Sequence, residues 1–254
     1  MALPSPPLPL RASRGTRCLL LMLVVLGWAG PAGAAETAVV QEILDGKELF
    51  IDQHQAKVQQ KARAPQQLTT RNSRGQILFN GGAVGRLNKF SHLRLGSSCF
   101  LVDKGQVLIS GNQNGCTRTA RLSVRGTNYL IEVNEAGESD ISVLEGRVEV
   151  ERLEDGQQGA SAPSILEAGQ RLRLSPRGVV LALLKLEAGD YERLLNGPLF
   201  QGYRLPIPGA GSLEAHLKSR FPGLNLPLPI GGSVLPLPQP PPRPVPPFGL
   251  PRLF

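Results

Sequence analysis

The stretch LSVRGTNYLIEVNEAGESDISVLEGRVEVERLEDGQQGASAPSILEAGQRLRL, residues 122–174, decides the fold. Within it, apolar and polar residues alternate over short segments, which is the pattern of strands with one buried face. These segments are residues 130–133, 141–144, 148–150 and 172–174. Turn-forming residues separate them, so the stretch predicts a β meander.

The same pattern continues upstream. Residues 76–87, QILFNGGAVGRL, read as two strands joined at residues 80–82, because Asn and Gly tolerate the positive φ of tight hairpin turns. Further strands are predicted at residues 92–95, 100–102 and 106–110, with a turn at residues 103–105. Many short strands with regular turn signals predict an all-β fold, an antiparallel β-sandwich.

The turn and core positions of the meander follow from its pattern. Glu145-Gly146 reads as a two-residue hairpin turn. Residues 41–51 fit neither period and leave a short helix or a strand pair open; we favour strands at residues 48–52 and 56–59 around a polar turn at residues 52–55. The expected core residues are Ile131, Val133, Ile141, Val143, Val148 and Val150.

Four segments in order resemble a known family. SVRGTNYLIEV (123–133), ISVLEGRVEV (141–150) and ILEAGQRLRL (165–174), preceded by residues 76–87, are similar to the periplasmic domain of FecR, the iron-citrate sensor and anti-sigma regulator. The resemblance covers roughly residues 46–178. It implies an exported β domain and no catalytic activity.

The residues that carry this motif have a structural interpretation. Gly126 before Thr127 suits a β-bulge or a close backbone approach, and Gly146 suits a tight turn. Gly169-Gln170 suits a corner before the final strand. We therefore expect these residues to shape the fold and not to bind a ligand.

The N-terminus follows the plan of a secretory signal. Arginines up to Arg17 precede an apolar run at residues 18–26, and small residues follow at 32–34. The run is shorter than the roughly 20 residues of a membrane span, so a cleaved signal peptide at residues 1–34 is favoured over an anchor. The mature chain is expected to begin near Ala35 and to be periplasmic or extracellular, with no integral membrane segment after cleavage.

Two functions follow from this location. A FecR-type sensor would carry a cytoplasmic helical segment that holds a sigma factor, then a transmembrane helix, and a cleaved leader argues against that arrangement here. The first expected function is a non-catalytic periplasmic or cell-envelope binding module. The alternative is a periplasmic sensor or regulatory subunit in FecR-type signal transduction through a membrane partner.

Two cysteines remain after the leader and its Cys18 are removed. An even pair in an exported chain favours a Cys99–Cys116 disulfide, worth about 3 kcal/mol in the chain-entropy model. A metal pair is the alternative, with His92 nearby, but further ligands are missing. No metal or cofactor is therefore expected.

Charge is unevenly distributed. The leader holds three arginines and no acid, so a net charge of +5 remains of the formal +8. Residues 57–125 contain many cations and the single acid Asp103, whereas residues 132–155 are strongly acidic. This pattern predicts a basic face for a protein or an anionic envelope polymer, a dipolar domain that associates head to tail, or cross-strand neutralisation. The candidate binding residues are Arg71, Arg74, Arg86, Lys89 and Arg94.

The C-terminal third changes in composition. After an apolar run at residues 181–186, a short helix is predicted at residues 191–196 with Asp190 as N-cap, and a second at residues 212–221 with Ser212 as N-cap. We expect these helices to pack on the β domain and not to wait for a partner. The predicted organisation is a signal peptide (1–34), a FecR-like β domain (35–185), a short helical extension (186–221) and a proline-rich disordered tail (222–254) that spaces or binds.

Several function classes are disfavoured. The mature histidines His54, His92 and His216 lie in separate segments, and hydrolase or metalloprotease motifs are missing, so no enzyme is expected. The only tryptophan, Trp28, lies in the leader, which argues against a base-stacking nucleic-acid site.

Overall fold

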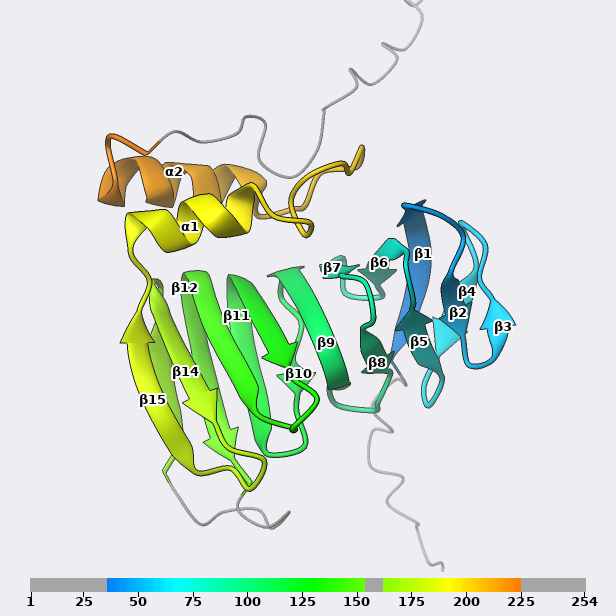
Figure 1. Cartoon of the computed structure of the whole chain (residues 1–254), viewed down its shortest axis with the longest axis horizontal. Helices are drawn as coiled ribbons and strands as arrows, with labels where there is room; N and C mark the ends of the chain where they lie inside the picture. The colour runs from blue at the N-terminus through cyan, green and yellow to red at the C-terminus, as the bar shows by residue number, and fades with distance from the viewer. Residues whose placement is uncertain (1–35, 154–161, 225–254) are drawn as a thin grey trace, which may run out of the picture. The chain divides into compact units, whose positions relative to one another are not determined.

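The computed structural model describes residues 36–153 and 162–224. The predicted signal peptide and all but the first three residues of the predicted proline-rich tail lie outside the described residues. Fifteen strands in one sheet and two helices make up the described chain (Figure 1). The predicted all-β class is confirmed.

The elements follow one another along the chain with short connections. The strands are β1 (Thr37–Leu44), β2 (Leu49–Ile51), β3 (His54–Gln55), β4 (Lys61–Arg63), β5 (Gln67–Thr70), β6 (Arg74–Phe79), β7 (Val84–Leu87), β8 (His92–Arg94), β9 (Phe100–Gly111), β10 (Gly115–Cys116), β11 (Ala120–Val133), β12 (Ser139–Arg152), β13 (Ser164–Glu167), β14 (Gln170–Leu174) and β15 (Val180–Lys185). The helices are α1 (Ala188–Leu195) and α2 (Ala210–Arg220). All strand pairs in the described ranges are antiparallel except β9 with β10.

Three long strands run through positions that the sequence predicts as turns or breaks. β9 passes through Gly105, β11 through Gly126 and β12 through Gly146, each at positive φ. The predicted turn at residues 103–105 and the predicted Glu145-Gly146 hairpin are therefore wrong. A glycine at positive φ bends these strands without reversing them, because β12 keeps β11 as its neighbour on both sides of Gly146. At Gly126 the pairing register shifts, as a bulge requires.

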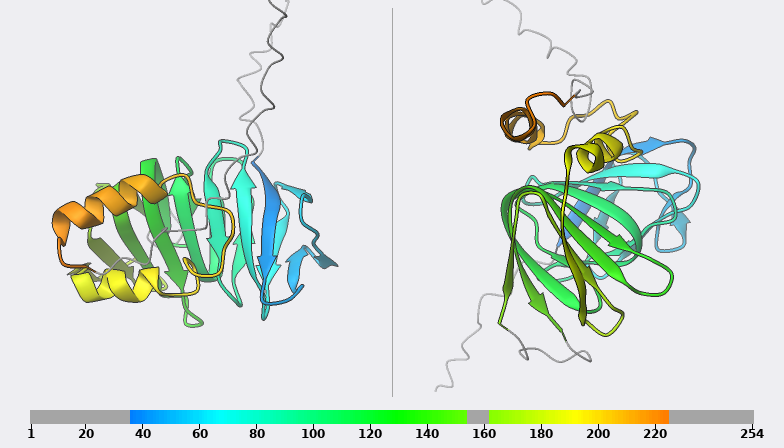
Figure 2. Two further views of the ribbon diagram at one scale, coloured as in Figure 1. Left: turned by 90° about the horizontal axis from the view of Figure 1, so that it is seen from above. Right: turned by 60° about the vertical axis from the view of Figure 1, so that its left-hand side comes forward.

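The bent strands let one strand take part in both halves of a curled sheet. The first half of β12 pairs with β14 and the second half with β13. Likewise, β9 pairs with β8 near its start and with β7 near its end. The sheet therefore curls over itself (Figure 2). One apolar cluster fills the space between the halves, and all six predicted core residues are buried in it.

The N-terminal strands differ in part from the prediction. Residues 41–51 contain the end of β1 and all of β2, so the strand pair is right and the helix is not. The predicted strand at residues 56–59 is wrong: the chain turns there, and β3 lies earlier, opposite β2. The hairpin at residues 80–82 is confirmed by the pairing of β6 with β7.

Both helices pack on the outer face of the sheet, as predicted. Leu108, Leu130 and Leu144 point outward from the sheet and form a second apolar cluster with helix residues that include Tyr191 and Leu213. The Tyr191 hydroxyl donates a hydrogen bond to the carbonyl oxygen of Leu144 at 3.0 Å. In the described residues, neither helix has the length and apolar character of a membrane span.

The helix caps lie earlier than predicted. α1 is capped by Glu187, and Asp190 is its third residue, whose carboxylate accepts a hydrogen bond from the Glu187 N–H at 2.8 Å. α2 is capped by Gly209, and the Ser212 hydroxyl donates back to the Gly209 carbonyl at 3.1 Å. A carboxylate three residues into a helix serves the cap as well as one at the N-cap itself, which explains the error.

Candidate functional site

Arg86, one of the five predicted polyanion-binding residues, is fully buried. Its guanidinium donates hydrogen bonds to the Gln76 side chain at 2.7 Å, to the carbonyl of Leu199 at 3.0 Å and to that of Leu205 at 2.8 Å. It also stacks 3.9 Å from the ring centroid of Tyr203. Burial lowers the pKa of Arg86 to about 10. This arginine holds the C-terminal segment to the sheet and cannot contact an external polyanion.

Arg74 has a similar structural role and is 8% exposed. Its Nε donates to the Asp45 carboxylate at 2.6 Å, and Nη1 donates to the carbonyls of Pro198 and, at 2.7 Å, Gln201. The hydrogen bond from Arg74 lowers the pKa of Asp45. The prediction of a binding role is therefore corrected for Arg74 and Arg86, because carbonyls far along the chain occupy their donors.

The other three predicted cations are exposed, and each has a partner within the domain. Arg71 lies 5.0 Å from the centroid of the Phe50 ring. Lys89 lies 3.7 Å from the Asp45 carboxylate, and Arg94 lies 3.3 Å from that of Asp103. The five residues therefore do not form one open basic face.

Cross-strand neutralisation accounts for much of the uneven charge. Arg173 on β14 lies directly opposite Asp140 on β12, and their side chains meet at 2.8 Å. Arg147 on β12 lies opposite Glu167 on β13, again at 2.8 Å. Exposed pairs of this kind contribute about 0–1 kcal/mol each. Their effect is to remove single-sign patches, which favours this alternative among those the sequence leaves open.

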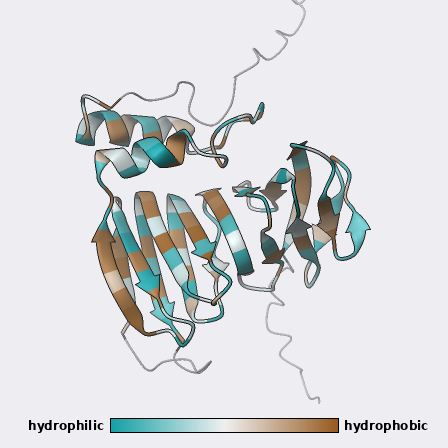
Figure 3. Cartoon of the chain, viewed as in Figure 1, coloured by the Kyte–Doolittle hydropathy of each residue, from teal (hydrophilic) through white to brown (hydrophobic). Residues whose placement is uncertain are grey.

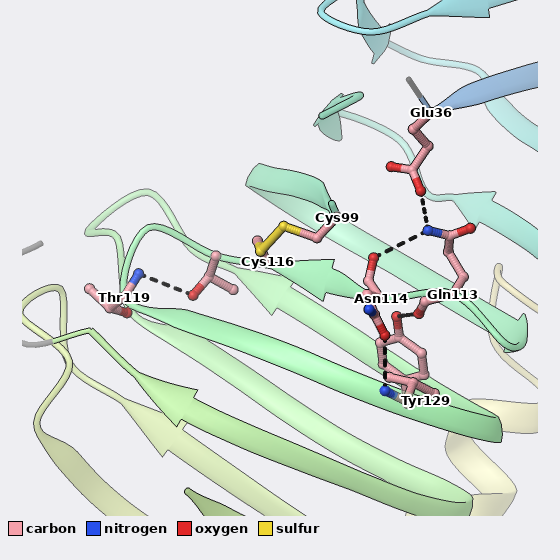
Figure 4. The surroundings of a disulfide bond; sticks show 9 residues. Glu36, Cys99, Gln113, Asn114, Cys116, Thr119 and Tyr129 are labelled. Atoms are coloured by element: carbon pink, nitrogen blue, oxygen red, sulfur yellow. Dashed lines mark hydrogen bonds between the residues drawn. A yellow bond between two sulfur atoms is a disulfide. The ribbon is translucent and has the colours of Figure 1, made fainter. Parts of the chain in front are cut away.

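The predicted Cys99–Cys116 disulfide is present and joins the start of β9 to β10 (Figure 4). Beside it, the Gln113 amide donates to the Glu36 carboxylate, and the buried Tyr129 hydroxyl donates to the Gln113 carbonyl at 2.5 Å. Burial raises the pKa of Glu36. These polar groups bind one another and fix the start of β1 to the loop before β10, so this corner is structural.

The predicted motif glycines also shape the fold. Gly146 faces Thr127, whose hydroxyl donates to the carbonyls of Arg125 and Arg147, each at 3.0 Å. Gly169, at positive φ, forms the corner between β13 and β14, and Gln170 begins β14. The Gln170 side chain accepts a hydrogen bond from the Glu167 N–H at 2.7 Å. These contacts are internal to the sheet.

The most open apolar feature is β15, at the end of the sheet. Leu183 is 58% exposed and lies opposite the buried Leu172, on the core face. Leu184 is 43% exposed and lies opposite Arg171, on the outer face. Figure 3 shows apolar colouring along most of this strand. β15 is therefore apolar and open on both faces.

One edge of β15 is also open. The strand pairs with β14 on one side and has no strand neighbour on the other within the described residues. Its pairing register shifts once, between Ala182 and Val180, so residues 182–185 form the regular part of the edge. The sequence shows the apolar run but not its place at an edge, which depends on the strand order of the sheet. A near-continuous apolar run is typical of a strand that is covered on both faces.

No catalytic or metal-binding arrangement emerges from the described residues. The three mature histidines come from β3, β8 and α2. Residues 36–153 and 162–224 contain no group of three or more His, Cys, Asp and Glu side chains suited to a metal ion. The candidate functional site is therefore the β15 edge, defined by Val180, Leu181, Leu183 and Leu184.

Comparisons with known proteins give a limited result. Protein-family models and curated proteins give no match. Among solved structures, the chain is similar to a crystal structure of a candidate anti-sigma factor from Parabacteroides distasonis, with 19% identity over 60% of this chain and 72% of that chain, at a TM-score of 0.41. A second structure of a candidate anti-sigma factor from the same organism gives 20% identity over 60% and 73%, at a TM-score of 0.40.

Proposed function

We propose that this chain is a non-catalytic interaction module of the cell envelope, and that the β15 edge pairs with a strand supplied by a protein partner. The observation that supports this most is the combination found in β15: apolar side chains on both faces and a free edge. In strand addition, main-chain hydrogen bonds give affinity and side chains on both faces give specificity.

The composition of the edge distinguishes it from a protected one. Natural edge strands avoid association through charges, prolines, bulges or covering elements. β15 has one bulge and one charge, Lys185 at its end, and its remaining residues are Val, Leu and Ala. The shift at the start of the strand leaves residues 182–185 as the segment that pairs with the partner.

Burial gives the driving force. Fully burying a leucine side chain is worth about 1.5–3 kcal/mol relative to leaving it exposed. A partner strand that covers Leu181, Leu183 and Leu184 therefore gains several kcal/mol before the cost of association. The envelope location rests on the predicted signal peptide, and the sensor role implied by the FecR resemblance stays a prediction.

The test compares the mature protein with L183K/L184K and with V58K. Val58 is 50% exposed and lies between β3 and β4, so V58K is a matched exposed apolar-to-lysine change away from β15. Immobilised wild type and V58K should retain the same protein from envelope extracts, or associate with themselves, and L183K/L184K should not. All three should unfold at similar temperatures, because the changed side chains are exposed.

Amide hydrogen exchange of the complex locates the contact. Protection should increase at residues 180–185 and not around Val58. Equal retention by wild type and L183K/L184K, protection that maps elsewhere, or the lack of any β15-dependent association would each overturn the proposal. Sedimentation of the purified protein decides whether the partner strand comes from a second copy.

A further inference from the structure

A cavity of about 240 Å³ lies between the outer face of the sheet and the segment that contains α1. It is separate from the β15 edge and from the buried arginines. Its floor comes from the sheet and its roof from residues 190–200. The apolar lining residues are Leu108, Leu130, Leu144, Leu194, Leu199 and Phe200, and the polar ones are Gln106, Arg171, Asp190 and Arg193.

The floor is apolar because three neighbouring long strands turn a leucine outward. Leu108 on β9 lies directly opposite Leu130 on β11, and Leu144 comes from β12. All three are nearly inaccessible to solvent. The second apolar cluster is therefore incompletely filled at this point, and an aliphatic group placed there would contact leucines on several sides.

Arg171 is the cation of the lining without a compensating charge. Its Nε donates to the Ser142 hydroxyl at 2.8 Å, which orients the guanidinium, and its two terminal nitrogens make no hydrogen bond or ion pair within residues 36–153 and 162–224. Arg193, by contrast, is paired with Asp190. Asp190 also caps α1 through the Glu187 N–H. The cavity therefore combines apolar walls with one free guanidinium fork.

We propose that this cavity binds a short aliphatic monocarboxylate, with the chain against the leucines and the carboxylate on Arg171. A guanidinium fork matches a carboxylate with two parallel hydrogen bonds. One uncompensated cation suits one negative charge, and the few polar groups offer little to a sugar or a peptide. The volume lies below the roughly 300–1,000 Å³ of pockets for drug-sized ligands, which limits the chain length.

Octanoate is the probe for this proposal. Titration calorimetry should show saturable binding to the wild type, and octanoate should raise the unfolding temperature. Acetate, which lacks the chain, and 1-octanol, which lacks the charge, should each bind at least about tenfold more weakly, because a lost charged hydrogen bond is worth about 1.5–3 kcal/mol.

Variants separate the cavity from other surfaces. R171Q should weaken octanoate binding by at least about tenfold, corresponding to the same charged hydrogen bonds. R177Q, in the exposed turn after β14, should bind as the wild type does. L194W should fill the cavity from α1 and abolish binding, and L183K should leave it unchanged, which excludes non-specific contact with β15.

Three results would overturn the proposal. They are no saturable octanoate binding to the wild type, R171Q binding equal to that of the wild type, or binding that L183K removes. If R171Q does not fold, as judged by circular dichroism, L194W decides: retained affinity in a folded L194W variant refutes the site. The outcome is independent of strand addition at β15, so failure of either proposal leaves the other standing.

Discussion

The guanidinium of Arg86 lies 3.9 Å above the ring of Tyr203, and both side chains are buried. Arg86 belongs to β7 in the sheet, and Tyr203 belongs to the segment between α1 and α2. The contact therefore joins the sheet to the C-terminal third of the chain. Both partners can be changed separately.

Replacing Arg86 by Met should lower the free energy of unfolding by at least about 3 kcal/mol. The substitution leaves the carbonyls of Leu199 and Leu205 and the Gln76 side chain without their donor, and each buried unsatisfied group costs about 1–3 kcal/mol. Urea unfolding measures the change, and limited proteolysis should cut residues 198–208 sooner. R86K should fall between, because Lys lacks the planar fork. A midpoint equal to that of the wild type would contradict the assigned role.

Tyr203 contributes its ring and not its hydroxyl. Among the described residues, that hydroxyl has no hydrogen-bond partner, so Y203F should change stability by less than about 0.5 kcal/mol. Y203L removes the aromatic face under Arg86 and should cost about 2 kcal/mol, the value of a desolvated cation–π contact. Urea midpoints of the two variants decide the matter. Equal losses would show that the ring face is not what matters.

The protein should lose stability above pH 10 through its tyrosines. All three tyrosines of the chain are buried, and burial raises the pKa of Tyr191 to about 12 and those of Tyr129 and Tyr203 further. In the unfolded chain they ionise near pH 10. The folded-state pKa values are the higher ones, so this stability is fully present below pH 10 and is lost as pH rises toward 12 and beyond. Arg86, with its lowered pKa, opposes the trend as one group against three.

Ultraviolet absorbance and circular dichroism, followed together against pH, check this behaviour. Phenolate absorbance should appear only with unfolding, and Y191F should remove about one third of it, since one of the three tyrosines is lost. A tyrosine that titrates near pH 10 in the folded protein would disagree with the burial of all three.

Two strand glycines should respond differently to alanine. Both have positive φ, but a Cβ at Gly146 would lie 2.9 Å from the Thr127 hydroxyl oxygen, whereas a Cβ at Gly126 meets nothing within 4 Å. G126A should therefore cost only the left-handed backbone penalty of about 1–2 kcal/mol. G146A should cost more, because the Thr127 hydroxyl must also move. Calorimetric unfolding of both variants gives the order, and a smaller loss for G146A would refute it.

Removing the disulfide should cost about 3 kcal/mol in the chain-entropy model for a loop of this length. The bond joins residues separated by 17 positions. C99S/C116S, studied by urea unfolding, should match the reduced wild type, because both lack only the cross-link. Non-reducing mass measurement checks the bond itself. A double variant as stable as the oxidised wild type would place the bond outside the stability of the fold.

Alternation of apolar and polar residues predicts the buried faces correctly, and the turns are where it fails. Gly105 and Gly146 adopt the positive φ that a hairpin turn also needs, so local sequence cannot separate a bend from a reversal. Only the pairing beyond the glycine does so, and that pairing is with strands elsewhere in the chain. The class of fold was therefore accessible and the length of the strands was not.

Arg86 and Leu183 show the same limit for the candidate site. A charged residue is expected at the surface, and Arg86 is buried because acceptors from residues 199 and 205 reach it. An apolar residue is expected inside, and Leu183 is open because β15 ends the sheet. Both placements depend on which distant segments meet.

The carbonyls that Arg74 and Arg86 require also set where this protein can be shortened. A version ending near residue 178, where the FecR-like pattern stops, would keep both guanidiniums and lose the carbonyls of residues 198–205 that accept their hydrogen bonds. The expressible unit thus extends past the last strand. Libraries, fusions and truncations of this protein need their C-terminal junction after α2, whatever the sequence motif suggests.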